Sequence, residues 1–518
     1  MNASSAQADA GETKTGPQWR WAFLGVLMCF AAITHQSLWN DEALTAVKAM
    51  QPSLHDWWHE MLGDKASDLQ MPLYMIYMWG FAKLSGTSEW ALRCANIPWF
   101  VTGLWAFMRG LTGPKKMSMA FIVLLSPFAW YYIGEARPYA MQLGASLMIF
   151  AALYRLGKDK VKVMKGERGW VLLFLFGVVS LSGSSLLGMI WAGAGCLAAG
   201  FVLGLDALTK LVRTNLVLCL ISFFLLAGLA GYYLWTLQIG ARASDVGRTD
   251  ARNLVFIIYE LLGFGGLGPG RLEIREEGWR AFLPFAKSLF IYGMLILDLL
   301  VLGGWRICRE QTRTKLCAIV LIIVLPMVTI LGAGYVKEFR VLGRHFTPLL
   351  PVILFILWVG LQARWSRPHW ASRPLAIGFV ILTLASCLSV RFAARHERDD
   401  YRDAAGFAKA ALETGREVWW NAGREGAVYY ELPLAETPNT SNAALWLMNP
   451  TVKMLQDSPS PEIVITSKPD VYDGNRIIAE YLAQGNYTKV GALPAFIIWQ
   501  RKTAFNASPQ QSVHGEFD

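Results

Sequence analysis

Charged residues are scarce in this chain, and so are the cysteine patterns that stabilise small secreted proteins. Only 17% of the 518 residues are Asp, Glu, Lys or Arg, whereas 54% are hydrophobic and the mean hydropathy is +0.34. An ordinary soluble protein is less apolar and more charged, so the composition excludes that class. The seven cysteines include no C-x-x-C pair, and they fall in the expected spans or at their cytoplasmic edges, not in the outer loops or the C-terminal tail. No disulfide framework is therefore expected.

Long apolar segments take up most of the first 390 residues. A membrane-spanning helix needs about 17 to 25 predominantly apolar residues. About eleven segments fit: 20–36, 90–108, 117–133, 138–154, 170–186, 187–205, 215–235, 282–304, 316–335, 347–362 and 373–390. The first of them lacks a convincing cleavage site and is interpreted as a retained span. The sequence thus predicts a polytopic α-helical membrane domain over residues 20–390.

The basic residues indicate an orientation. Lys and Arg concentrate in alternate connections, around residues 109–116, 155–168, 306–315 and 364–373. Because short basic loops stay in the cytoplasm, the N-terminal tail, residues 1–19, is predicted to be cytoplasmic and the C-terminus to lie outside. Much of the net charge of +10 then faces anionic lipid headgroups. We therefore expect membrane lipids as partners and no nucleic acid.

Three loops, 37–89, 236–281 and 336–346, are expected on the non-cytoplasmic face. In the first, residues 41–50 and 54–62 are amphipathic and predict interfacial helices, with Trp57, Trp58 and Trp79 as headgroup-level anchors. The second contains the glycine-rich stretch 263–270. That stretch fits either a lid that orders over a substrate or a disordered connector.

The last part of the chain, residues 391–518, is less hydrophobic. Its patterns predict helices over 399–413 and 472–484 and strands over 417–421, 462–466 and 495–500. We expect a small soluble α/β domain on the non-cytoplasmic side.

Two adjacent acids, Asp41 and Glu42, directly follow the first predicted span. A carboxylate at this boundary could accept a proton from a hydroxyl while a lipid-borne substrate stays in the bilayer. On a helix the two side chains point about 100° apart, so at most one faces a given reacting atom. Asp68 is a second candidate acid. The alternative is that these residues simply solvate an interfacial loop.

Basic residues suited to an anion lie near the same face. Glu135 and Arg137 stand between the third and fourth predicted spans, where they could bind and orient a phosphate or form an interfacial ion pair. The short outer loop before the tenth span adds a cationic cluster that runs against the positive-inside bias, which a bound anion would explain. Its members are Lys337, Arg340, Arg344 and His345.

Two further features are open to more than one interpretation. His55 and His59 are four residues apart and would share a helix face, so they could bind a metal or merely occupy an interfacial helix. Asp298, inside the eighth span, is interpreted as a group near the cytoplasmic end rather than as a proton relay.

The ordered motifs resemble GT-C glycosyltransferases of the protein O-mannosyltransferase and lipid A aminoarabinose transferase type. The resemblance extends over about the first 155 residues and more weakly to residue 390. The segments that carry it are Trp39-Asn40-Asp41-Glu42-Ala43, Asp68-Leu69-Gln70-Met71-Pro72-Leu73-Tyr74, Ser88-Glu89-Trp90-Ala91-Leu92-Arg93, Glu135-Ala136-Arg137-Pro138-Tyr139-Ala140 and Arg344-His345-Phe346-Thr347-Pro348-Leu349-Leu350-Pro351.

This resemblance implies an outward-facing site and a donor sugar carried on a polyprenyl phosphate. Asp41 would be the general base on an acceptor hydroxyl, with Glu42 and Asp68 as further catalytic acids and inversion at the anomeric carbon. The substrate-binding residues implied are Gln70, Tyr74, Glu135, Arg137, Tyr139, Lys337, Arg340, Arg344 and His345. Family members commonly have a histidine where this chain has Gln70. The sequence commits to no cofactor, and a divalent cation stays open.

The preferred function is an integral membrane glycosyltransferase of cell-envelope glycan synthesis, transferring a hexosyl or pentosyl group. The acceptor would be a lipid, a glycan or a protein, and the expected location is the bacterial inner membrane with a periplasmic C-terminal domain. Two alternatives remain: a transporter or flippase of a lipid-linked sugar, and a membrane-anchored glycan-binding module.

Overall fold

The computed structural model describes residues 19–63, 67–111, 116–158, 168–240, 249–366, 370, 372–438 and 442–502. Apart from Trp19, the predicted cytoplasmic tail lies outside these residues. The chain divides into two compact units. The first comprises Met1–His35 with Thr45–Glu397, and the second comprises Gln36–Leu44 with Arg398–Asp518. The short segment that carries Asp41 and Glu42 is thus grouped with the C-terminal domain.

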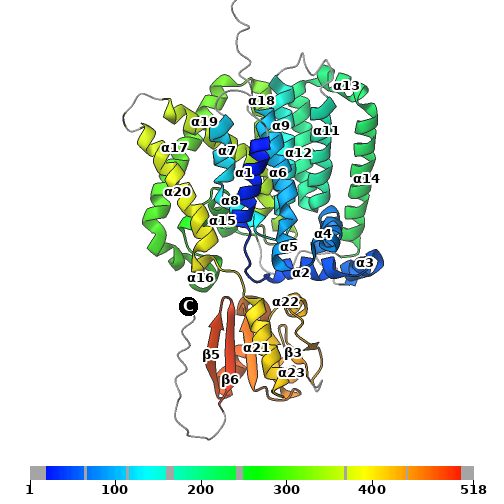
Figure 1. Cartoon of the computed structure of the whole chain (residues 1–518), viewed down its shortest axis with the longest axis vertical. Helices are drawn as coiled ribbons and strands as arrows, with labels where there is room; N and C mark the ends of the chain where they lie inside the picture. The colour runs from blue at the N-terminus through cyan, green and yellow to red at the C-terminus, as the bar shows by residue number, and fades with distance from the viewer. Residues whose placement is uncertain are drawn as a thin grey trace, which may run out of the picture. The chain divides into compact units, whose positions relative to one another are not determined.

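The first unit is helical throughout its described residues (Figure 1). Its α-helices are α1 (Trp19–Ala32), the second half of α2 (Asn40–Met50), α3 (Leu54–Gly63), α4 (Pro72–Ser85), α5 (Glu89–Cys94), α6 (Asn96–Gly110), α7 (Lys116–Leu124), α8 (Pro127–Ile133), α9 (Tyr139–Lys158), α11 (Arg168–Ser184), α12 (Leu186–Leu203), α13 (Leu205–Thr214), α14 (Leu216–Gln238), α15 (Ala251–Leu261), α16 (Arg271–Glu277), α17 (Ala286–Glu310), α18 (Arg313–Val336), α19 (Leu350–Trp365) and α20 (Ser372–Phe392). Its 3-10 helices are η1 (Ser67–Gln70), η2 (Gly265–Leu267), η3 (Gly278–Phe285), η4 (Gly343–Leu349) and η5 (Ala394–His396).

Seven helical stretches among the described residues are long and apolar enough to cross a membrane. They include α9, α12, α14, α18 and α20, together with two longer runs in which a short helix leads into α17 or α19. Helices α1 and α11 are apolar but shorter. The predicted single span 117–133 is divided into α7 and α8, because Ser126 caps a new helix that has Pro127 in its first turn.

Small residues allow the central helices to pack closely. A Cβ atom on Gly103 of α6 would lie 2.5 Å from the Cα atom of Gly144 in α9, and one on Gly144 would overlap the carbonyl oxygen of Trp99. Helix α9, with most of its residues buried, lies in the middle of the bundle (Figure 1). In lipid, close backbone contact replaces much of the hydrophobic driving force between helices.

Asp298 is an acid in the middle of α17, away from the ends of this helix. Asp298 of α17 accepts a hydrogen bond of 3.0 Å from Nε of Arg364 near the end of α19. This arginine belongs to a connection predicted to be cytoplasmic. A charged side chain within a membrane span is costly without a partner, and Arg364 provides that partner for Asp298.

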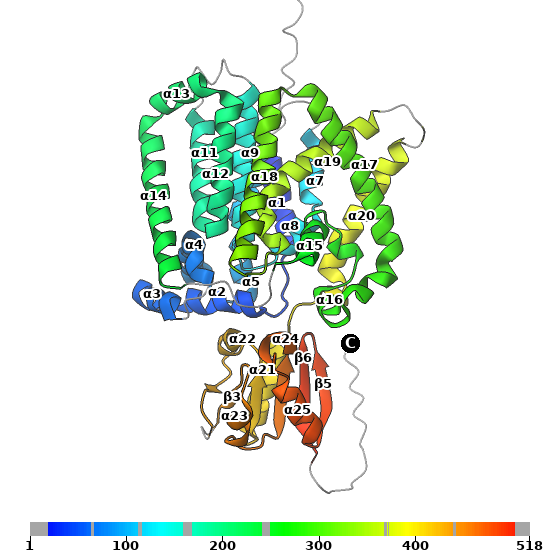
Figure 2. The same cartoon turned by 180° about the vertical axis from the view of Figure 1, so that it is seen from behind.

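The predicted interfacial segments of the first outer loop are helical. Helix α3 runs crosswise to the long helices, as two views show (Figures 1 and 2). Trp58 stacks on Trp235 of α14 with a centroid separation of 5.9 Å. Trp57, in contrast, is buried within the protein, with 6% of its surface exposed.

The glycine-rich stretch 263–270 is ordered rather than a loose connector. A Cβ atom on Gly266 would overlap the carbonyl oxygen of Ser386, and one on Gly270 would overlap that of Arg395. The Arg395 guanidinium donates hydrogen bonds of 3.0 Å to the carbonyl oxygens of Gly266 and Gly268. Glycine is needed here because the backbone passes close to other backbone. The disordered-connector interpretation is therefore wrong.

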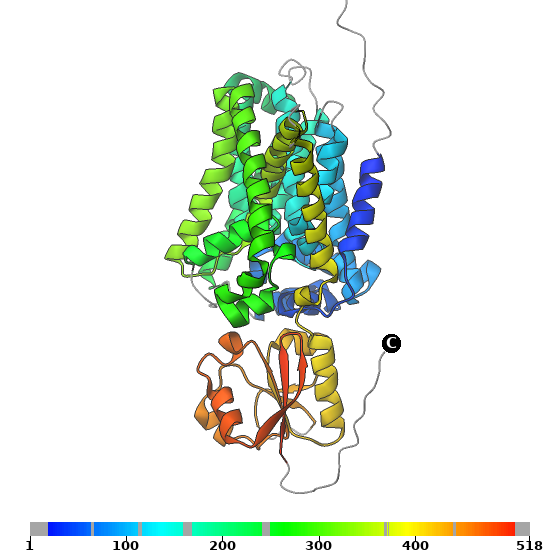
Figure 3. The same ribbon diagram turned by 90° about the vertical axis from the view of Figure 1, so that its left-hand side faces the viewer.

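The second unit is an α/β domain with one six-stranded sheet in the order β2-β3-β1-β4-β6-β5 (Figure 3). Strands β2, β3, β1 and β4 are parallel, whereas β6 is antiparallel to both β4 and β5. The elements are α21 (Tyr401–Glu413), β1 (Val418–Asn421), α22 (Arg424–Tyr429), β2 (Leu434–Ala435), β3 (Ala444–Trp446), α23 (Val452–Gln456), β4 (Ile463–Ser467), α24 (Pro469–Tyr472), α25 (Ile477–Gln484), β5 (Tyr487–Leu493) and β6 (Phe496–Arg501).

Alternating side chains of β1 and β4 build a core on each face of this sheet. Trp420 and Ile465 pack with α21 residues on one face, while Trp419 and Val464 pack with α25 residues on the other. This is the period-two pattern of a strand buried on both sides. The predicted helix 472–484 is interrupted, because the Asp473 carboxylate caps a new helix by accepting the amides of residues 478 and 479.

We predict that Gly144→Leu destabilises the membrane unit strongly, because the added side chain must displace the backbone of α6. Overpacking of a filled core typically costs about 1 to 3 kcal/mol, and a backbone contact of this kind belongs at the upper end. Thermal unfolding of the detergent-solubilised protein measures the effect. Gly193→Leu is the control, since nothing lies within 4 Å of a Cβ at that position. Equal melting temperatures for the two variants would contradict the proposed packing.

Candidate active site

Asp68 is the centre of a buried charge cluster in the first unit. It lies in η1 with 1% of its side chain exposed, and its Oδ2 accepts a hydrogen bond of 3.1 Å from the Lys48 Nζ atom. Its Oδ1 accepts one of 3.0 Å from Arg137. Burial alone would raise the pKa of Asp68, but the two cations outweigh it, so the pKa is lowered. The carboxylate is therefore ionised and bound to two cations.

Arg137 joins this cluster to the start of α9. It is 4% exposed and also donates a hydrogen bond of 2.9 Å to the Thr45 hydroxyl of α2. The alternatives considered for it were a phosphate contact and an ion pair with Glu135. The structure pairs it with Asp68, a partner that neither alternative named. Sequence reasoning missed Lys48, although its position seven residues after Asp41 places both on one face of a helix.

Glu135 is fully buried in the turn between α8 and α9. The Asn96 side chain shapes this turn by donating to the carbonyl oxygens of Ile133, at 2.9 Å, and Glu135, at 2.5 Å. The turn ends at Tyr139, whose ring meets the ring of Tyr132 edge-on at 4.9 Å. The expected site residues of this motif thus lie between two aromatic helix ends.

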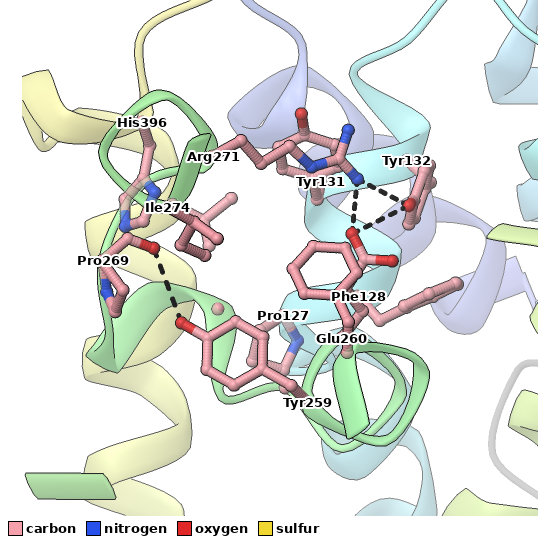
Figure 4. A pocket seen from close by; sticks show the side chains of 14 residues that line it. Pro127, Phe128, Tyr131, Tyr132, Tyr259, Glu260, Pro269, Arg271, Ile274 and His396 are labelled. Carbon is pink, nitrogen blue, oxygen red and sulfur yellow. Dashed lines mark hydrogen bonds and ion pairs between the residues drawn. The ribbon is translucent and has the colours of Figure 1, made fainter. Parts of the chain in front are cut away.

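A cavity of about 50 Å³ opens beside this turn (Figure 4). Arg271, the first residue of α16, donates hydrogen bonds of 2.7 Å to the Tyr132 hydroxyl and 2.5 Å to Glu260 Oε1. Its guanidinium also lies 4.3 Å from the ring centroid of Tyr131. The other lining residues are Pro127, Phe128, Phe256, Tyr259, Gly263, Gly265, Pro269, Ile274, Val390 and His396.

The cavity combines an apolar aromatic wall with one accessible cation. The Arg271 side chain is 37% exposed, whereas that of Glu260 is 10% exposed. Burial and the neighbouring Arg395 lower the pKa of His396 to about 4, so this imidazole is neutral at neutral pH. Arg271 is therefore the group in this cavity able to meet an anion. Arg271 and Glu260 match no local sequence motif, whereas Tyr132 belongs to the tyrosines that flank the Glu135-Arg137 motif in the sequence.

The predicted cationic cluster of residues 337–345 separates into two parts. Lys337 and Arg340 are exposed. The Arg344 guanidinium lies 5.8 Å from the ring centroid of Tyr139, close to the cavity-lining Tyr132. His345 accepts the Leu342 amide at Nδ1, at 3.2 Å, so its imidazole closes a turn of η4.

The remaining candidate residues from the sequence differ in their burial and in their contacts. Gln70 ends η1, and Tyr74 is fully buried in α4. His55 pairs with Asp56 at 3.7 Å with 89% of its side chain exposed. Within the part of the chain that the structure describes, no group of three or more His, Cys, Asp or Glu residues is placed to hold a metal ion.

The two acids at the start of α2 belong to the second unit. Glu42 is fully buried, and its Oε2 accepts a hydrogen bond of 2.8 Å from Arg398. Asp41 is only partly buried. One of the two acids is therefore bound to a cation within its own unit, and the other is partly accessible.

No protein-family model and no curated protein sequence matches the chain. Solved structures are similar to it. ArnT from Cupriavidus metallidurans in the apo state is 10% identical, the alignment covers 93% of this chain and 97% of that chain, and the TM-score is 0.53. The same enzyme bound to undecaprenyl phosphate is 11% identical, with 95% and 99% covered and a TM-score of 0.50. Arabinofuranosyltransferase AftD from Mycobacteria is 12% identical, with 94% and 40% covered and a TM-score of 0.37.

At these identities the likeness to ArnT concerns the fold. It extends over nearly the whole of both chains, and the apolar helices described above are of membrane-spanning length. The expected architecture is therefore confirmed: the protein is an integral membrane protein with the GT-C fold and a small C-terminal α/β domain.

Proposed function

We propose that the protein is a glycosyltransferase that moves a sugar from a polyprenyl phosphate to an acceptor hydroxyl on the outer face of the membrane. The observation that carries the proposal is the Arg271 cavity, which offers one cation among tyrosines and prolines. Such a lining suits a phosphate attached to an apolar chain. The fold agrees, because the similar ArnT structures include one bound to undecaprenyl phosphate.

In the proposed reaction Asp41 takes the proton of the acceptor hydroxyl. The hydroxyl oxygen forms a bond to the anomeric carbon while the bond from that carbon to the phosphate oxygen breaks, so the lipid phosphate leaves with the electron pair. One direct displacement inverts the anomeric centre. Arg271 and Arg344 are assigned to the negative charge that grows on the leaving phosphate.

The face of α2 supports the choice of Asp41 over Glu42. Asp41, Thr45 and Lys48 are spaced i, i+4 and i+7 and so share a helix face. Glu42 points elsewhere and is bound to Arg398. Asp68, already bound to two cations, is assigned the role of holding Lys48 and Arg137 in place rather than that of a base.

The first test is the Asp41→Asn variant in an assay that presents the purified protein with a panel of polyprenyl-phosphate sugars and measures released lipid phosphate. Removing a general base typically costs about 10² to 10⁴ in rate, so we expect a loss of that size with donor binding preserved. Wild-type turnover in this variant would refute the assignment of the base.

The second test replaces Arg271 by Gln. We expect kcat/KM for the donor to fall about 10-fold to 100-fold, because a charge-assisted contact to phosphate is worth about 1.5 to 3 kcal/mol. Arg306→Gln is the matched control, since Arg306 forms a surface ion pair of 2.6 Å with Glu310 on α17. An equal effect of the two substitutions would show that the cavity has no special role.

The third test concerns the Asp68 cluster. Asp68→Asn leaves Lys48 and Arg137 buried without their counter-ion, and breaking a buried pair costs about 3 to 5 kcal/mol. We expect a markedly lower melting temperature, whereas Glu310→Gln should change it little.

The same cluster predicts a pH dependence of stability. Because the pKa of Asp68 is lowered by folding, the stabilisation from its carboxylate is complete above the ordinary pKa of about 4 and is lost as the pH falls through the lowered value. The Asn variant should lack this acid-dependent loss.

A further inference from the structure

The parallel strands of the second unit have a switch in their order at β1. The chain passes from β1 to β2 and β3 on one side, and then to β4 on the other side of β1. In open α/β sheets, ligands bind outside the carboxyl ends of the strands where the order switches in this way. The residues that follow these strand ends, Gly423 after β1 and Lys468 after β4, mark the position.

Residues of the segment 36–44 contact the residues that follow these strand ends. A Cβ atom on Gly423 would overlap the side chain of Asn40. The Nζ atom of Lys468 lies 5.9 Å from the ring centroid of Trp39. Lys468 also forms an ion pair with Asp399, which directs its side chain across the strand end. The place where a related sheet would bind a ligand is thus taken by the chain itself.

Hydrogen bonds fix this segment before Asp41. The Tyr430 hydroxyl accepts the Leu38 amide at 2.8 Å and the Ser37 hydroxyl at 3.1 Å. The Arg402 amide donates to the same Ser37 oxygen at 3.1 Å. Ser37 and Leu38 are buried, so each of these polar groups needs its partner.

An ion pair fixes the residue that follows Asp41. Glu42 has 0% and Arg398 has 8% of its side chain exposed, at a separation of 2.8 Å. Removal of either partner would take away an ion pair formed between two buried side chains, which is costly. The backbone on both sides of Asp41 is therefore attached to the C-terminal domain by contacts within one compact unit.

We infer that the C-terminal α/β domain is a positioning device for Asp41, and that Tyr430 and Arg398 are its positioning residues. This inference rests on the proposed role of Asp41 as the general base. A base must lie within about 2.6 to 3.2 Å of the proton it removes, and a misplacement of about 1 Å can cost about 10²-fold in rate. Neither residue is required to contact the substrate.

The test uses Tyr430→Phe in the full-length protein, which removes only the hydroxyl that accepts the Leu38 amide. Tyr487→Phe is the matched control, because its hydroxyl donates a hydrogen bond of 2.7 Å to Pro461 elsewhere in the same domain. We expect kcat for lipid phosphate release to fall at least tenfold in Tyr430→Phe with KM for the donor unchanged. The control should keep the wild-type kcat.

Hydrogen exchange of the Leu38 amide gives a readout that needs no activity. It should become at least tenfold faster in Tyr430→Phe and stay unchanged in Tyr487→Phe. Unchanged exchange in Tyr430→Phe would overturn the docking. Faster exchange with wild-type kcat would overturn the positioning role.

Arg398 provides the conservative rescue. Arg398→Gln should reduce kcat about 100-fold, and Arg398→Lys should recover most of this loss, because a lysine still neutralises Glu42. Equal losses in both variants would contradict positioning through the ion pair.

The two proposals can fail separately. A wild type that releases no lipid phosphate from any donor would overturn the proposed function and with it the role of Asp41. The exchange of the Leu38 amide would still show whether the segment is docked.

Discussion

The buried carboxylate of Asp68 lies between Lys48 and Arg137, and the structure of the membrane unit around the candidate site depends on this interaction. It joins three segments that are distant in the sequence: the second half of α2, η1, and the turn before α9. A lone charge in this environment would be strongly unfavourable, so each member is stable only with the others present. The cluster therefore fixes the backbone that leads into the aromatic wall of the cavity.

The cavity is formed by side chains that come from several separate helices. Helix α8 supplies the tyrosines, α15 supplies Glu260, and α16 begins with Arg271. Glu260 neutralises part of the arginine charge and orients the guanidinium, whose exposed part remains available to an anion. Between α15 and α16, Gly263, Gly266 and Gly270 pack closely against Pro127, Ser386 and Arg395, so this stretch is part of the packed structure rather than a loose linker.

The adjacent acids at the start of α2 have separate surroundings. Glu42 is buried against Arg398 as an attachment point, whereas Asp41 is partly accessible. Trp39 and Asn40 contact the residues that follow β4 and β1 in the C-terminal sheet, and these contacts support the inferred role of this domain in holding the segment 36–44.

The sequence by itself determined the membrane class, the positions of most helices, the α/β character of the C-terminal domain and the acids worth testing. These properties depend on runs and periods of neighbouring residues, which a local pattern records. It could not determine the partners. Arg137 binds Asp68, 69 positions away, and Glu42 binds an arginine 356 positions away. Only the tertiary structure brings such charges together, because their pairing depends on which helices pack against one another and on the cost of burying any of them alone.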